Sequence, residues 1–423
     1  MPEDRPIITS LLDADFYKFT MGQFIWKYYP DTQAVFKLIN RTINIRLADL
    51  VDVEEFARQL DLARELRPRK TELYYLRGMD IYGRNMFLEG YLQSFAKYQL
   101  PPYELRVKDG QFELTFSGNW RDVSMWETVA LAILSELRLL AGLARMSARE
   151  ADIMFKKAEI KLYDKLQLIK GHLTVTFSDF STRRRNSFEW HEKAVRMAMD
   201  VLGPKQFVGT SNTLLAFLLD LIPIGTNAHE LQMVTAALYP SAAEKRSSQY
   251  RILCLWQELY GDGLRVFLPD TFGTDQFLEY ASDEIAHVWR GSRQDSGDPY
   301  EYGEKMIEWY EKRGVCPSEK LIIFSDGLDA ETMIQLEEHF QPRIKATAGW
   351  GTLFANDFRG CFPEHLWQFF SPISIICKPV SAEGKPTVKL SDNIQKATGP
   401  EEAIKEYLEI FGKGRRKDIP VLV

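Results

Sequence analysis

Short apolar runs alternate with amphipathic stretches over residues 123–370. The short runs predict strands at 173–177, 206–208, 223–224, 264–268, 287–289, 321–324 and 344–346. Apolar residues at helical spacing predict helices between them, at 186–202, 274–286, 300–313 and 330–340. Strands that alternate with helices predict a parallel sheet, and this many units predict a closed, irregular α/β barrel.

The two ends of the chain follow a different pattern. Near the N-terminus the spacing predicts helices at 13–29 and 53–66, a strand at 34–39 and a hairpin at 103–116. Residues 373–390 predict another hairpin of the same kind. We therefore predict an α+β domain formed from both chain ends, residues 1–122 and 372–423, and a barrel domain over residues 123–371.

Each predicted strand is followed by a short polar or glycine-rich segment. These segments are 178–185, 209–212, 225–230, 269–271, 293–298, 325–327 and 349–352. In α/β barrels the residues after the strands gather on one face, where barrel enzymes place their chemistry. We expect the segments to converge on one site.

Composition limits the partners of the chain. A net charge of −6 over 423 residues gives no basic surface of the kind that binds nucleic acid. The most apolar segments, 129–144 and 214–222, are interrupted by charges and too short to cross a membrane. The four cysteines have no Cys-x-x-Cys spacing, which argues against a disulfide framework or a structural zinc. We expect a cytoplasmic protein that binds neither nucleic acid nor membrane.

Three post-strand segments combine glycine with threonine. The pairs are Gly209 with Thr210, Gly225 with Thr226, and Gly349 and Gly351 with Thr352. Glycine lets backbone N–H groups approach an anion closely, and the threonine hydroxyl donates to a phosphate oxygen. One such segment alone is more typical of an ordinary turn. Three of them at strand ends favour phosphate binding, and barrels often hold phosphate at their late strands.

Charged residues after the strands suit an anionic or sugar substrate. In the arginine run 183–185 at most two side chains can reach one ligand, and the others are expected to be solvated. Arg293 and Asp295 share a loop in which Asp298 is expected only to cap the next helix. A buried Asp295 would bind sugar hydroxyls or stabilise a developing cation. Asp326 suits ribose hydroxyls or Mg²⁺, and a plain turn residue equally well.

Two ring side chains follow strands. Phe180 would stack on an aromatic substrate or fill the core, and its spacing does not decide between these roles. His229 follows an apolar run and a Gly-Thr pair, at a site suited to anions. A histidine nucleophile needs such a place, and His229 is the only one of the six histidines to which we assign a function.

Eight segments, in order along the chain, resemble the nicotinate phosphoribosyltransferase family. They are 15–18, 179–185, 209–212, 225–230, 295–299, 324–329, 349–352 and 388–391. The resemblance implies a type II phosphoribosyltransferase-like barrel with an α+β domain from both chain ends. It implies that nicotinate and phosphoribosyl pyrophosphate give nicotinate mononucleotide and pyrophosphate, a step of NAD biosynthesis and salvage. It also implies ATP as co-substrate, Mg²⁺ as cofactor, and a homodimer with a shared active site.

The resemblance implies roles for single residues too. His229 would be transiently phosphorylated by ATP, with Asp295 and Arg293 as the other catalytic residues. Phe180 would stack on one face of the pyridine ring, and Tyr17 of the neighbouring subunit on the other. The remaining substrate-binding residues would be Arg183, Thr210, Ser211, Asp326, Gly327, Gly349, Gly351 and Thr352. No metal ligands are assigned.

Ser211 favours the acid over the amide as substrate. In related nicotinamide-using enzymes an aspartate follows the Gly-Thr pair, whereas the Ser211 side chain would not repel a carboxylate. A phosphoribosyltransferase for nicotinamide or quinolinate is the main alternative, although quinolinate enzymes need no phosphorylated histidine. A barrel lyase or aldolase would need a strand-end lysine or a metal cluster. A non-enzymatic binding module does not explain the converging charged segments.

Overall fold

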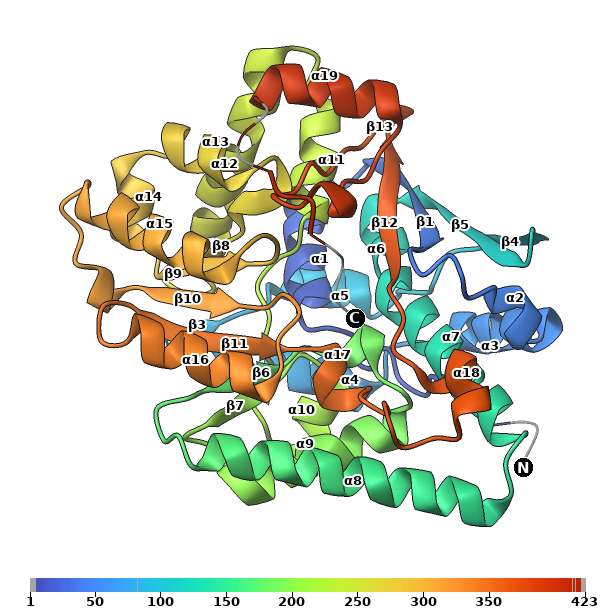
Figure 1. The fold of residues 1–423 in the computed structure, drawn as a ribbon. Helices are drawn as coiled ribbons and strands as arrows, with labels where there is room; N and C mark the ends of the chain where they lie inside the picture. Colours follow the sequence, from blue (N-terminus) through green and yellow to red (C-terminus); the bar gives the residue numbers. More distant parts are fainter. Residues whose placement is uncertain (1–4, 82, 413, 415, 420–423) are drawn as a thin grey trace.

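Two sheets organise the computed structural model, which describes residues 5–81, 83–412, 414 and 416–419 (Figure 1). One sheet has six strands in the order β7-β6-β11-β10-β9-β8, and the other has five in the order β13-β12-β1-β5-β4. A small ribbon joins β2 (Asp80–Ile81) to β3 (Arg84–Asn85). The carboxyl ends of the six strands face the five-stranded sheet, and this arrangement positions the site.

The six-stranded sheet confirms the predicted α/β class. Its strands are β6 (Phe177–Asp179), β7 (Phe207–Thr210), β8 (Val266–Phe267), β9 (Gly291–Gln294), β10 (Leu321–Phe324) and β11 (Lys345–Trp350). Every pairing is parallel. The intervening helices include α8 (Ala148–Lys170), α9 (Phe188–Leu202), α15 (Pro299–Glu311) and α16 (Ala330–Phe340) (Figure 1). Since β7 and β8 are the edge strands, the unit is an irregular, barrel-like α/β layer.

Three predicted elements were wrong. Residues 287–289 do not form a strand, because α14 (Asp283–Val288) ends there and β9 begins at Gly291. The Gly-Ser-Arg-Gln sequence of β9 gives no apolar signal, and its glycine is needed because a Cβ at Gly291 would lie 1.9 Å from the Leu321 carbonyl oxygen. The predicted helix 274–286 is split into α13 (Thr274–Tyr280) and α14. The run 223–224 forms only an isolated bridge to Thr210.

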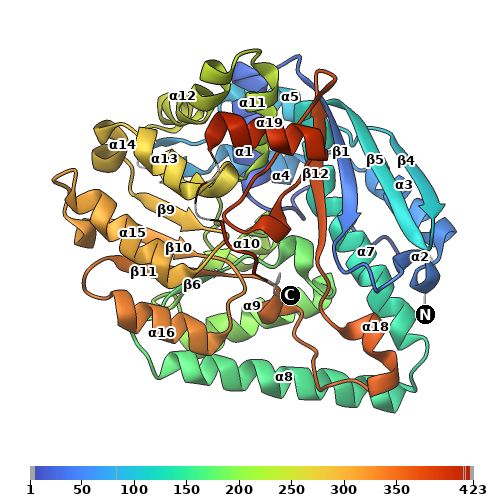
Figure 2. The ribbon, with the colours of Figure 1, turned by 45° about the horizontal axis from the view of Figure 1, so that its top comes forward.

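Strands from both ends of the chain share the antiparallel sheet. β1 (Gln33–Asn40) pairs with β5 (Gln111–Asn119) on one side and β12 (Ile375–Ala382) on the other (Figure 2). β4 (Tyr103–Lys108) and β13 (Lys385–Pro386) are the edge strands. The second strand of the predicted C-terminal hairpin is therefore short. The predicted domain boundaries, which include residues 1–4 and 420–423 outside the described ones, stay a prediction.

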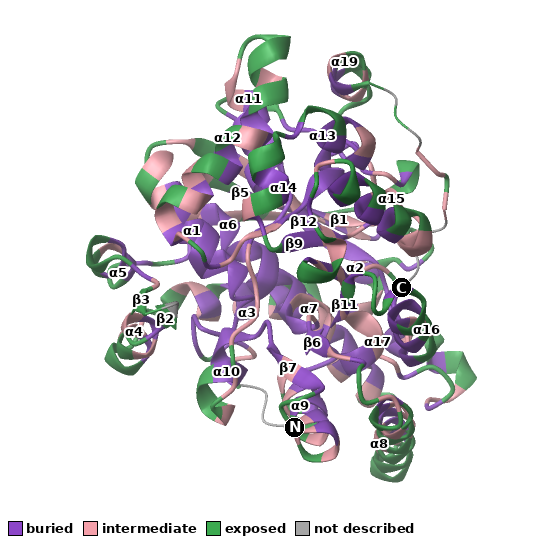
Figure 3. Ribbon diagram, turned by 90° about the vertical axis from the view of Figure 1, so that its left-hand side faces the viewer, coloured by how far each residue is buried: buried purple, intermediate pink, exposed green. Residues whose placement is uncertain are grey.

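Two buried helices join the sheets. In α1 (Tyr17–Tyr28) every residue from Tyr17 to Ile25 is buried, so its polar side chains need partners inside the protein. α7 (Trp126–Leu143) packs against β12 and against α3 (Val53–Glu65). Figure 3 shows α1 and α7 as largely buried segments, whereas α8 lies at the surface. Among the described helices, none has the length and apolar character to cross a membrane.

Candidate active site

The post-strand segments converge on one cavity of about 640 Å³ between the two sheets. Six of the seven predicted segments line it, through residues that include Phe180, Ser211, His229, Asp295, Asp326 and Gly349. The seventh, 269–271, lies just behind His229, because the hydroxyl of Thr271 is 2.9 Å from its Nδ1 atom. The opposite wall comes from the antiparallel unit, with Tyr17, Arg41 and Lys378. The expected convergence is confirmed.

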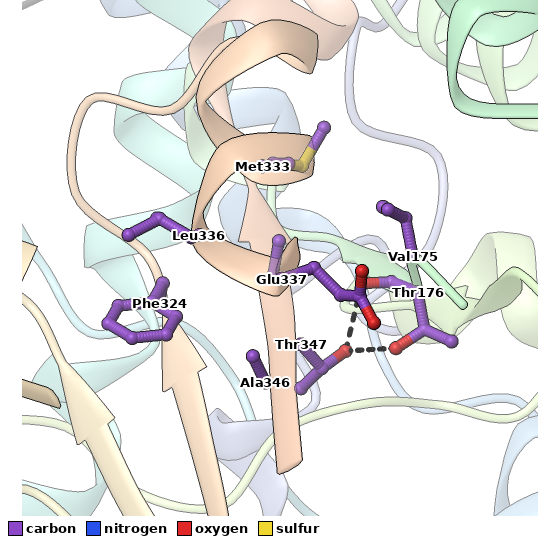
Figure 4. A pocket seen from close by; sticks show the side chains of 9 residues that line it. Val175, Thr176, Phe324, Met333, Leu336, Glu337, Ala346 and Thr347 are labelled. Carbon is purple, nitrogen blue, oxygen red and sulfur yellow. Dashed lines mark hydrogen bonds between the residues drawn. The ribbon is translucent and has the colours of Figure 1, made fainter. Parts of the chain in front are cut away.

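A second cavity, between α16 and strands β10 and β11, is too small for a substrate. Its volume is about 10 Å³, which is room for about one water molecule. Figure 4 shows its walls, where the Thr176 and Thr347 hydroxyls lie 2.8 Å apart. We assign the chemistry to the large cavity, because most of the predicted site residues line it and none of them lines this one.

His229 lies at the start of α11 (Glu230–Leu238) with both ring nitrogens engaged. Its Nε2 atom is 2.9 Å from Asp295 Oδ2 and 2.9 Å from Lys389 Nζ. Burial lowers the pKa of His229 to about 4, against the attraction of Asp270. The imidazole is therefore neutral at pH 7, as a nucleophile requires.

Among the described residues, one group of three acidic or histidine side chains could hold a metal ion. That group is His229, Asp270 and Asp295, whose ligand atoms lie within 4.8 Å of one another. The Lys389 ammonium group lies among them. The Lys389 Nζ atom is 3.6 Å from Asp270 and 3.9 Å from Asp295. Burial lowers the pKa of Lys389, although both carboxylates oppose that shift. The ammonium group thus takes the place where a metal ion would sit.

The Phe180 ring lines the cavity instead of filling the core. It packs directly on Gly349, where a Cβ atom would lie 2.3 Å from the ring. Tyr17 of the same chain lines the same cavity, and its hydroxyl is 3.4 Å from Arg183 Nη1. The cavity of one chain therefore contains both aromatic side chains.

The arginine run divides as predicted, with two side chains at the cavity. Arg183 and Arg184 line it, whereas Arg185 is fully buried and forms an ion pair with Asp13. The expectation that the third arginine is solvated was wrong. Burial, together with repulsion from Arg183, lowers the pKa of Arg184 to about 10.

Two predicted substrate-binding residues have internal partners. The Thr210 hydroxyl donates to Asp179 Oδ2 at 2.6 Å, and Thr210 does not line the cavity. The Ser211 hydroxyl donates to Asp15 Oδ1 at 2.8 Å. Asp15 itself lines the cavity, so a carboxylate lies beside Ser211 that the sequence did not reveal.

The other predicted residues lie in the cavity wall. Asp326 accepts a hydrogen bond from Lys396, and Gly327, Gly351 and Thr352 line the same region. Arg293 donates to the Asn227 carbonyl at 3.1 Å and lies 4.0 Å from Asp295. The side chains of Arg293 and His229 lower the pKa of Asp295 well below its ordinary value although burial opposes them. Asp295 is therefore ionised.

Cations outnumber anions in the wall by eight to four. The cations are Arg41, Arg183, Arg184, Arg293, Arg359, Lys378, Lys389 and Lys396, and the anions are Asp15, Asp295, Asp326 and Asp329. A cavity with this excess of positive charge concentrates polyanionic substrates. Arg41, Lys378 and Lys396 were not predicted, because they come from the chain ends and carry no local motif. Lys389 lies in the family-like segment 388–391, but no role was assigned to it.

A parallel α/β unit with a cationic cavity at its strand ends, glycine-rich segments and a neutral histidine defines a phosphoribosyltransferase-type enzyme. The chain belongs to the nicotinate phosphoribosyltransferase family. The family model matches residues 175–414, and the model of the family's N-terminal domain matches residues 12–135. The chain is thus an enzyme of this family, and its reaction is part of NAD biosynthesis.

Solved structures of the family agree over the full length. The nicotinate phosphoribosyltransferase of Porphyromonas gingivalis is 28% identical, with a TM-score of 0.84, over 96% of this chain and 100% of its own. The enzyme of Vibrio cholerae is 30% identical, with a TM-score of 0.84, over 97% of this chain and 96% of its own. The similarity therefore covers both sheets and the cavity between them.

Proposed function

We propose that the chain couples nicotinate mononucleotide synthesis to ATP hydrolysis through a phosphoryl group on His229. The environment of His229 carries this proposal, because its neutral ring lies in the cationic cavity with Lys389 2.9 Å from Nε2. In the tautomer that donates from Nδ1 to Thr271, Nε2 carries the lone pair, which would attack once Lys389 no longer donates to it. The γ-phosphoryl group of ATP would move to Nε2 and ADP would leave. Water would later release phosphate and restore the ring.

The cavity residues support a division of roles in the transfer itself. Phe180 and Tyr17 would hold the pyridine ring of nicotinate between them. The segment of Gly349, Gly351 and Thr352 would bind the 5′-phosphate through backbone N–H groups and a hydroxyl. The lysine and arginine side chains of the cavity wall would neutralise the charge of pyrophosphate.

The chemistry follows from these positions. The ring nitrogen of nicotinate forms a bond to C1 of the ribose while the bond from C1 to pyrophosphate breaks. Positive charge develops on the ribose, and the ionised Asp295 stabilises it. Holding the nitrogen and C1 in contact supplies much of the acceleration. Phosphorylation of His229 adds negative charge beside Lys389 and Asp295, which gives ATP a local means to change substrate affinity.

Mg²⁺ fits this site as a partner of the substrate phosphates. All four lining aspartates have protein partners: Asp15 contacts Ser211, Asp295 contacts His229, Asp326 contacts Lys396, and Asp329 caps the first turn of α16. Mg²⁺ would therefore be held mainly by the pyrophosphate oxygens. A bound Mg²⁺ would neutralise the leaving group, as such ions do in phosphate chemistry.

Assembly and location remain predictions. The resemblance implies a homodimer in which Tyr17 comes from the partner, yet Tyr17 of the same chain lies in this cavity. We infer that one chain supplies both rings even if a dimer forms. The four unpaired cysteines, all within the described part of the chain, support a reducing compartment such as the cytoplasm.

Labelling tests the phosphohistidine directly. The protein is mixed with ATP labelled in its γ-phosphoryl group, and the acid lability of any protein-bound label is measured. We expect an acid-labile, base-stable label on the wild-type chain and none on His229→Ala. Equal labelling of both proteins would exclude His229 as the acceptor. Nicotinamide and quinolinate, offered in place of nicotinate to the same protein, test the alternative substrates.

A further inference from the structure

A buried cluster of charges lies behind the cavity wall. The Lys18 ammonium of α1 is 2.7 Å from Glu127 Oε2 and 2.6 Å from Glu230 Oε2. All three side chains are at most 1% exposed. Desolvation of buried charges often cancels their attraction, so a cluster of this kind is weak evidence for stability alone. What its members touch is therefore the better guide to its role.

Of the two carboxylates in this cluster, that of Glu127 accepts hydrogen bonds from side chains that line the cavity. Its Oε1 atom accepts from Lys378 Nζ at 2.8 Å, and its Oε2 atom accepts from the Tyr17 hydroxyl at 3.2 Å. Both Tyr17 and Lys378 line the cavity. The carboxylate of Glu230 instead accepts from Lys18, from Ser124 at 2.6 Å and from the Trp120 indole at 3.1 Å, none of which lines it.

The protonation states support a fixed arrangement. Burial alone would raise the pKa of Glu127, but Lys18 and Lys378 outweigh it and hold the pKa well below its ordinary value. Burial raises the pKa of Tyr17 well above its ordinary value, so the phenol keeps its proton and donates it. A lysine has a flexible stem and a mobile ammonium group. The ionised carboxylate restricts that motion and orients both wall residues before substrate arrives.

We propose that Glu127 is a positioning residue of the transferase reaction. It holds the Lys378 ammonium toward the anionic substrate and the Tyr17 ring toward the pyridine ring. This inference rests on the proposed function, because it assumes that these two residues contact nicotinate and phosphoribosyl pyrophosphate.

Glu127→Gln and Glu230→Gln form a matched pair for the test. Each variant removes one buried carboxylate that pairs with Lys18, but only Glu127→Gln removes the carboxylate that Tyr17 and Lys378 contact. We expect Glu127→Gln to raise KM for nicotinate and for phosphoribosyl pyrophosphate about tenfold, with kcat within about threefold of wild type. Glu230→Gln should lower the melting temperature similarly and leave both KM values within about twofold. Equal KM values in the two variants would overturn the proposal.

A double-mutant cycle tests whether Glu127 acts through Lys378. Lys378→Gln should raise KM in the wild-type background and add little in the Glu127→Gln background, because the interaction is already lost. Fully additive effects would contradict the proposal. If Glu127→Gln does not fold, Lys18→Gln with Glu127→Gln leaves the net charge of the cluster unchanged, and its KM values are compared with those of Lys18→Gln with Glu230→Gln. A wild-type protein without product would refute the proposed function itself, whereas normal product with unchanged KM values refutes only the role of Glu127.

Discussion

At the scale of single residues, the position of the Phe180 ring in the cavity wall depends on glycine at position 349. The Phe180 ring occupies the space that a Cβ at position 349 would need. Gly349→Ala must therefore displace the ring, since the added atom would lie 2.3 Å from it. We expect KM for nicotinate to rise about tenfold, the equivalent of about 1.4 kcal/mol of lost binding. Steady-state kinetics measure this KM, and Gly78→Ala, at an exposed glycine, is the control. An unchanged KM in Gly349→Ala would show that Phe180 does not contact the pyridine ring of nicotinate.

Ser211 supports specificity in a way that involves Asp15. Its hydroxyl donates to the Asp15 carboxylate, so Ser211→Asp would place two carboxylates side by side at the cavity. Like charges at this distance repel each other and a carboxylate substrate. We expect kcat/KM for nicotinate to fall at least about tenfold in Ser211→Asp. In Ser211→Asn, which adds no charge, kcat/KM should fall less. Equal losses in the two variants would exclude charge as the cause.

Chemistry with a local sequence signal was predictable, and chemistry from distant segments was not. The cavity position of the 349–352 segment was predicted from a strand, a turn and their residue types. That of His229 was predicted from an apolar run and a Gly-Thr turn, although the run forms only an isolated bridge. Glu127 gave no such signal. Asp15 and Lys389 lie in the family-like segments 15–18 and 388–391, but their roles were not predictable because their partners are far away in sequence. Lys389 and His229, for example, are 160 positions apart.

At the scale of elements, apolar periodicity predicted several amphipathic helices well and small strands poorly. The helix α16 begins and ends as predicted, whereas β9 was missed because polar residues form it. Strand β9 is held by its parallel neighbours β8 and β10, and those contacts are not visible in its own sequence. Tertiary pairing overrides local propensity there.

The first turn of α15 offers a stability test. Asp298 accepts from the N–H groups of Tyr300 and Glu301, as its position before Pro299 predicted. Asp298→Ala leaves these groups without their cap and should lower the free energy of unfolding by about 1 kcal/mol. Asp298→Asn, which preserves the hydrogen-bond acceptor, should lose less of the free energy of unfolding. Denaturant unfolding measures both, and no loss with alanine would contradict the capping role.

At the scale of the whole molecule, the buried His229 links stability to pH. Its pKa of about 4 in the folded state lies below the ordinary 6.5, so the unfolded chain binds the proton first as pH falls. The contribution of the neutral His229 imidazole to the free energy of unfolding is therefore largely retained at pH 7. It is lost as the pH falls from about 6.5 to about 4. Between pH 7 and 5 the wild type should lose about 2 kcal/mol more of its free energy of unfolding than His229→Gln. Equal losses in the two proteins would show that the imidazole is not held neutral.

The cavity is assembled by the whole chain. The barrel-like sheet supplies His229 and Asp295, and the two chain ends supply Tyr17 and Lys389. The phosphoryl group proposed for His229 would thus lie where both units meet. Coupling of ATP to the transfer is the claim on which this account depends.

The most direct test measures nicotinate mononucleotide formed from nicotinate and phosphoribosyl pyrophosphate, with and without ATP, by wild type and His229→Ala. The account predicts that ATP stimulates the wild type and has no effect on the variant, which keeps only the rate seen without ATP. Equal stimulation of both proteins, or a wild type that ATP does not affect, would contradict the role of His229.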